Sequence, residues 1–127
     1  MAKDEPTAAT AASIPAFDRV IATTAGVDRK GAKVPYTSLN GNMSSYLADD
    51  GTLVLRLSAA DRERFMEAYD SRLHEAYGIV QKEYVDVPAR LLAETDELRP
   101  WFAASVAYVG GLRPKATKRP SRGDAAG

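Results

Sequence analysis

The sequence predicts an α+β domain of two layers, in which helices cover one antiparallel five-stranded sheet in the order α-β(3)-α-β(2)-α. The pair Asn40-Gly41 joins two β-prone runs and favours the type I′ turn of a β-hairpin. Apolar residues recur at helical spacing before, between and after the strand segments. The turns between strands are short, which favours antiparallel pairing with helices on one face of the sheet.

The 127 residues divide into one domain and two flanking segments. Residues 1–13 are rich in Ala, Thr and Pro and have almost no large apolar side chain, so we predict a disordered leader. Residues 14–112 form the predicted domain. Residues 113–127 are rich in Pro, Lys, Arg, Ser and Gly, and we predict a disordered basic tail.

The first predicted helix begins after Ser13, which serves as its N-cap, and ends at Gly26. Its buried stripe consists of Ile14, Phe17, Val20, Ile21 and Thr24.

The hairpin follows. Counting outward from its turn pairs Leu39 with Asn42 and Ser38 with Met43. The same count pairs Tyr36 with Ser45 and Val34 with Leu47. Side-chain alternation then predicts one face with Val34, Tyr36, Met43 and Leu47, and another with Thr37, Asn42, Ser44 and Tyr46.

A turn at residues 49–51 leads into a third strand over 52–57. Ser58 and Asp61 form a capping signal for a second helix, whose buried stripe consists of Phe65, Met66, Tyr69 and Leu73. Two further strands surround a bend at Gly78 within residues 75–87. Pro88 begins a short helix through Leu92, and a final helix begins at Thr95 or Arg99.

Four segments carry a family resemblance: residues 29–31, 34–43, 82–88 and 107–115. Their sequences include Val-Pro-Tyr-Thr-Ser-Leu-Asn-Gly-Asn-Met and Lys-Glu-Tyr-Val-Asp-Val-Pro. Over residues 14–115 the chain resembles small bacterial proteins of the TfoX/Sxy N-terminal-domain type, which are related in fold to the YjbR-like proteins. The resemblance implies a fold like that of secretion chaperones and a non-enzymatic role in regulation or protein interaction.

The residues of the predicted hairpin and the basic loop before it indicate a binding patch, because their hydroxyl and amide groups could hydrogen-bond an anionic ligand or a protein partner. The patch consists of Lys30, Lys33, Tyr36, Thr37, Asn42, Ser44 and Tyr46. The alternative interpretation is an ordinary solvated sheet face beside a basic loop. Exposed antiparallel strands also favour edge pairing, so we expect a homodimer.

The charge distribution gives the second function hypothesis. The formal net charge is zero, but residues 113–127 hold five cations against Asp124 alone, a net of +4. The cations are Arg113, Lys115, Lys118, Arg119 and Arg122. They predict weak, salt-sensitive and non-specific contact with nucleic acid. The tail has no aromatic residue to stack on bases, which favours a solubilising role as the alternative.

No catalytic, metal or cofactor motif is complete in this sequence. His74 is the one histidine and cysteine is absent, so neither a zinc site nor a disulfide is expected. We interpret His74 as a surface or capping residue, because a Ser-His-Asp arrangement would need Ser38, Ser44 or Ser45 to approach it. No glycine-rich phosphate loop occurs. We therefore predict a non-enzymatic protein without a cofactor.

Lys82 and Glu83 are interpreted as a solvated strand face, with a buried ion pair or a binding pair as the alternative. No stretch approaches the roughly 18 apolar residues of a membrane-spanning helix, and no signal peptide is recognisable. We expect a cytoplasmic protein with no membrane association.

Overall fold

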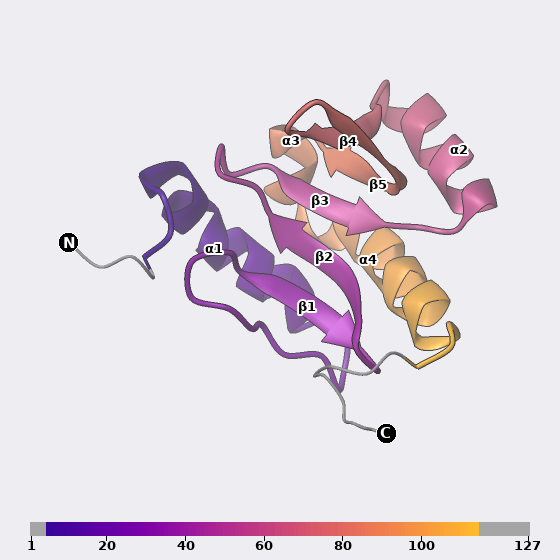
Figure 1. The fold of residues 1–127 in the computed structure, drawn as a ribbon, viewed down its shortest axis with the longest axis horizontal. Helices are drawn as coiled ribbons and strands as arrows, with labels where there is room; N and C mark the ends of the chain where they lie inside the picture. Colours follow the sequence, from indigo (N-terminus) through magenta and orange to yellow (C-terminus); the bar gives the residue numbers. More distant parts are fainter. Residues whose placement is uncertain (1–4, 115–127) are drawn as a thin grey trace.

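Figure 1 shows the computed structural model, which describes residues 5–114. One antiparallel sheet of five strands in the order β1-β2-β3-β5-β4 forms one layer, and helices form the other. The predicted α+β architecture is confirmed. The elements are α1 (Ala8–Ile21), β1 (Tyr36–Leu39), β2 (Asn42–Leu47), β3 (Leu53–Arg56), α2 (Ala59–Tyr69), β4 (Leu73–Ala76), β5 (Ile79–Val87), α3 (Ala89–Leu92) and α4 (Thr95–Gly110).

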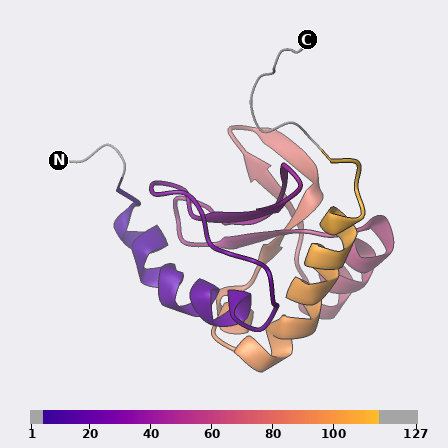
Figure 2. The same ribbon diagram turned by 90° about the horizontal axis from the view of Figure 1, so that it is seen from below.

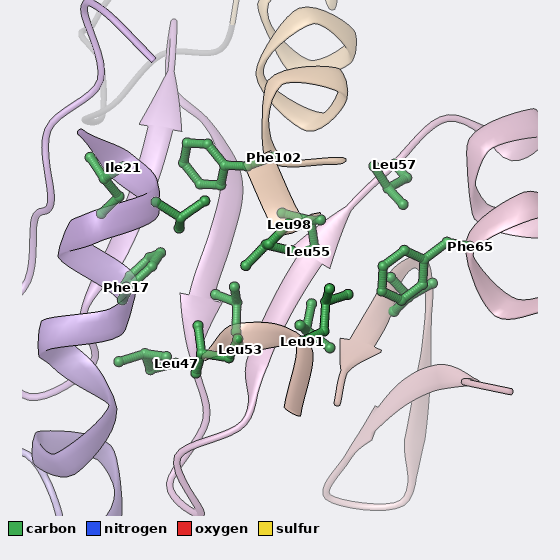
Figure 3. Packing of buried hydrophobic residues seen from close by; sticks show 14 of the residues in the cluster. Phe17, Ile21, Leu47, Leu53, Leu55, Leu57, Phe65, Leu91, Leu98 and Phe102 are labelled. Carbon is green, nitrogen blue, oxygen red and sulfur yellow. The ribbon is translucent and has the colours of Figure 1, made fainter. Parts of the chain in front are cut away.

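The hydrophobic core lies between the helices and one face of the sheet (Figure 3). Phe17 of α1 and Phe102 of α4 are fully buried there, together with Leu53 and Leu55 of the central strand β3. Figure 2 shows the helices on the same side of the sheet. The opposite face is therefore left without a helical cover, and we call it the open face.

The β1–β2 turn forms as predicted, with positive φ at both Asn40 (55°) and Gly41 (83°). The pairs nearest the turn are also confirmed. Beyond them a bulge adds one residue, Ser44, to β2, so that Thr37 pairs with Ser45 and Tyr36 with Tyr46. The predicted pairs of Tyr36 with Ser45 and of Val34 with Leu47 are therefore wrong.

Helix α1 begins at Ala8, so the predicted disordered leader is wrong for residues 8–13. Thr7 is the N-cap, and its hydroxyl accepts from the Thr10 amide at 3.0 Å. The Thr10 hydroxyl then donates to the Ala48 carbonyl at 2.6 Å, and that of Ser13 to the Gly51 carbonyl at 2.8 Å. Polar contacts to the β2–β3 turn thus order a segment that has few apolar groups.

Close packing at this contact requires a small residue. A Cβ atom at Gly51 would lie 2.7 Å from the Ala9 carbonyl oxygen. Glycine at this position lets the first turns of α1 approach the sheet.

Helix α2 has the predicted N-cap, because Ser58 Oγ accepts from the Asp61 amide at 3.3 Å. It ends at Tyr69, and the next residue, Asp70, has a left-handed backbone conformation with φ 51°. Leu73, predicted in the buried stripe of this helix, instead begins β4. The short helix after Pro88 is confirmed, and α4 begins at Thr95, the earlier of its two predicted starts.

The β4–β5 hairpin leaves the plane of the sheet. Leu73 pairs with Val85 and Glu75 with Val80, so residues two apart on β4 meet residues five apart on β5. The extra residues bend the long strand β5, and Figure 2 shows the hairpin rising on the side away from the helices. The open face is consequently hollowed rather than flat.

Candidate binding groove on the open face of the sheet

A groove of about 680 Å³ lies between the β4–β5 hairpin and the β1–β2 hairpin. Its hairpin wall consists of Glu75, Ala76, Tyr77 and Ile79. The opposite wall, which we call the Val34 wall, consists of Val34 and Met43. Tyr46, His74 and Gln81 form the floor, and residues 48–50 close one end.

The floor is held together by contacts between strands that are not neighbours. The Tyr46 hydroxyl on β2 donates to Gln81 Oε1 on β5 at 2.9 Å. The ring of Tyr46 also packs edge-on against His74 on β4, with 5.8 Å between the ring centroids. Val54 on β3 is paired with Tyr46 on one side and Asp86 on the other, and it is fully buried. The curled hairpin thus crosses over β3 to reach β2.

Burial raises the pKa of the Tyr46 hydroxyl to about 12, and the neighbouring Tyr84 hydroxyl acts in the same direction. The hydrogen bond to Gln81 opposes this shift but does not cancel it. Tyr46 is therefore a neutral donor at physiological pH.

His74 is not the surface or capping residue that the sequence suggested. It lies within β4, its side chain is 12% exposed, and its Nδ1 atom is 2.6 Å from Asp86 Oδ1. Ser44 and Ser45 are buried at the helix-facing side of the sheet, and Ser38 accepts a hydrogen bond from Lys30. None of the three candidate serines is brought to His74.

A second polar cluster lies beside the floor and includes Glu83. Arg56 Nε is 2.7 Å from Glu83 Oε1, and the Tyr108 hydroxyl donates to Glu83 Oε2 at 3.1 Å. Burial alone would raise the pKa of Glu83, but the hydrogen bonds from Arg56 and Tyr108 outweigh it and lower that pKa. Glu83 is thus paired with Arg56 rather than solvated as predicted, whereas Lys82 is exposed.

Arg56 ties this cluster to β2. Its Nη1 atom donates to the Met43 carbonyl at 3.2 Å, and its guanidinium carbon lies 5.6 Å from the centre of the Tyr84 ring. These contacts fix β3, β5 and the start of β2 relative to one another, which stiffens the base of the groove.

The structure divides the predicted hydroxyl patch between the two faces of the sheet. Thr37 and Ser44 are fully buried, so they are not part of an exposed surface. The Thr37 hydroxyl is 2.6 Å from that of Ser44 and 2.5 Å from that of Ser45. Ser105 of α4 donates to the Ser44 carbonyl at 3.0 Å, so this hydroxyl cluster joins the helix to the sheet.

The remaining members of the predicted patch do not converge on one site. Tyr46 lies in the floor of the groove, and Tyr36 is half-buried. Lys30 Nζ donates to Ser38 Oγ at 2.9 Å, and Asn42 Nδ2 donates to the Arg113 carbonyl at 3.0 Å. Lys33 is exposed beside Val34.

Sequence reasoning missed the hairpin wall of the groove. The signal for it was the apolar sequence Tyr77-Gly78-Ile79-Val80, which places three large apolar residues at the end of a hairpin. Of the predicted nucleic-acid contacts, Arg113 is described and exposed. Lys115, Lys118, Arg119 and Arg122 lie outside the described residues.

No protein-family model, curated protein or solved structure matches this chain. Within residues 5–114, no three His, Asp or Glu side chains are placed to hold a metal ion. The helices of that same range are too short or too polar to span a bilayer.

Proposed function

We propose that this chain is a non-enzymatic protein-interaction module with a regulatory role, and that it binds its partner through the open face of the sheet. The main observation in support is the exposed apolar surface of this face and of the β4–β5 hairpin. The exposed fractions are 97% for Tyr77, 68% for Ile79, 49% for Val80 and 41% for Val34. Clustered apolar groups of this kind mark contact surfaces.

The conformation of Tyr77 supports the same proposal. Its φ of 54° is in the left-handed region, which bulky residues rarely adopt. In the isolated chain the ring makes almost no contact that could offset this cost, because it is nearly fully exposed. A partner that covers the ring would supply the missing contact.

The polar floor supports a groove that exists before binding. The Tyr46–Gln81 hydrogen bond and the His74–Asp86 pair hold the curled hairpin in place. A preformed surface loses little conformational entropy when it binds. The order of elements is also the one that the resemblance to TfoX N-terminal domains implies, and that resemblance is the basis for the regulatory role.

The test is site-specific photo-crosslinking in cells. A photoreactive phenylalanine analogue replaces Tyr77 in one variant and Ala103, exposed on α4, in the other. We expect a defined protein adduct from position 77 and none from position 103. Equal labelling from the two positions, or none from position 77, would contradict the proposal.

The basic tail supports a second candidate function, accessory binding of nucleic acid. The net charge of +4 over residues 113–127 suits weak contact with phosphates. Fluorescence anisotropy with labelled DNA at low and high salt tests it, with a chain ending at residue 114 as the control. Absence of binding at low salt eliminates this function.

A further inference from the structure

We infer that the partner is a second copy of this chain, joined through the groove about a two-fold axis. This inference rests on the proposed function, because it names the partner of the same surface. A two-fold interface uses one patch on both copies, so that patch must carry both halves of every contact. The groove meets this requirement in its apolar groups and in its charges.

The two walls of the groove are both apolar. Tyr77 and Ile79 project from the hairpin wall, and Val34 and Met43 form the Val34 wall. A two-fold axis that runs along the groove, above its floor and parallel to it, turns the second copy face to face with the first and exchanges the walls. The hairpin of each copy then lies on Val34 and Met43 of the other. The dimer therefore contains two equivalent contacts that bury these exposed apolar groups.

The same exchange brings opposite charges together. Glu75 belongs to the hairpin wall, and Lys33 directly precedes Val34 on the other side. Both side chains are exposed, and neither forms an ion pair within residues 5–114. In the exchanged arrangement Lys33 of one copy faces Glu75 of the other. Complementary charges of this kind fix the orientation of an interface.

Tyr77 occupies the position of an anchor residue in this arrangement. Tyrosine is enriched among the few residues that dominate binding energies, and such residues lie near the centre of an interface within apolar surroundings. The charged pair lies at the edge, where it selects the orientation. The hairpin thus supplies both affinity and register.

Sedimentation equilibrium of the full chain over a wide concentration range tests the inference. We expect the mass to rise from one chain to two. Ile79→Asp should stay monomeric, whereas Ala103→Asp on the exposed side of α4 should dimerise like the wild type. A wild-type chain that is monomeric at every concentration overturns the inference.

A charge exchange tests the orientation and does not alter the apolar groups. Glu75→Lys and Lys33→Glu should each weaken dimerisation by roughly tenfold. The double variant should recover most of the wild-type affinity, because the pair is restored with reversed signs. Additive weakening in the double variant overturns the proposed arrangement. Both positions are exposed, so the circular dichroism spectrum should be unchanged in all three variants, and so should thermal melting at concentrations where the wild type is monomeric.

The cross-linking at position 77 separates this inference from the proposed function. A dimer-sized adduct of the chain with itself supports both. A monomeric wild type that cross-links to a different protein overturns the second copy as partner and leaves the interaction module standing. A monomer without any adduct overturns both.

Discussion

Thr37 shows how the surroundings of one side chain decide its role. Its hydroxyl, with those of Ser44 and Ser45, lies in a fully buried cluster beneath α4. Alternation along the strands correctly grouped Thr37 with Ser44, but it cannot tell which face of a sheet the helices cover. The bulge at Ser44 shifts the alternation of β2 by one residue, so Ser45 lies on the same face as Thr37. Tyr46 lies on the opposite face and Leu47 in the core, which corrects the predicted grouping of these two residues. These hydroxyls stabilise the fold rather than form a binding patch.

Thr37→Val should therefore lower the free energy of unfolding by about 1–2 kcal/mol, because it leaves buried serine hydroxyls without their partner. Thr24→Val is the control, since no side-chain hydrogen bond of Thr24 is present in the described part of the chain and its side chain is half-buried. Urea unfolding of both variants measures the difference. Equal stability of the two variants would contradict the structural role of the cluster.

Tyr46 gives a pH prediction. Its pKa is raised from 10.0 to about 12 in the folded chain, so the folded state holds this proton more tightly than the unfolded state does. The stabilisation is complete below pH 10 and is lost as the pH rises from 10 to 12. Tyr46→Phe should flatten the loss of stability in this window and remove one late step from the tyrosinate absorbance titration. An unchanged titration curve would show that Tyr46 does not ionise late.

At the scale of elements, local chemistry predicted turns and caps better than strand register. Asn40-Gly41 and Ser58 occupy the positions that their residue types indicate. The first half of α1 was missed, because its Thr and Ser side chains bond to a turn about forty residues away in sequence, which composition does not record. The start of β4 was also missed. The chain reverses at Asp70, whose positive φ is not signalled by a glycine in the sequence.

Gly41→Val tests the hairpin turn. A β-branched residue resists the φ of 83°, so we expect a loss of about 1–3 kcal/mol in the free energy of unfolding. Gly110→Ala is the control, because a Cβ there meets no atom within 4 Å and alanine favours helix. It should be neutral or slightly stabilising. A stable Gly41→Val variant would refute the turn.

Thr10→Val tests the docking of α1 on the β2–β3 turn. Thr10 is 1% exposed and its hydroxyl donates to the Ala48 carbonyl, so loss of this bond should cost about 1–2 kcal/mol. Thr10→Ser retains the hydroxyl and should recover part of that loss. Equal stability of the Val and Ser variants would show that the hydrogen bond contributes nothing.

At the scale of the whole molecule, the order of elements and the one-sided helical cover followed from the sequence, but the groove did not. The groove depends on extra residues in β5 that bend the hairpin over Val54 until His74 and Gln81 reach Tyr46. Such a shift in register reflects packing between distant segments rather than any local residue preference. The sequence placed the binding surface on the hydroxyl-bearing residues, whereas the surface that we propose lies largely on a different hairpin.

The most direct test maps the contact surface residue by residue, by recording amide chemical shifts of the labelled chain as its concentration rises. The account predicts concentration-dependent shifts at Val34, Met43, Tyr77 and Ile79, with no change at Ala103 and Ala107 on the exposed side of α4. Shifts confined to the helical layer, or spectra that are identical at all concentrations, would contradict it.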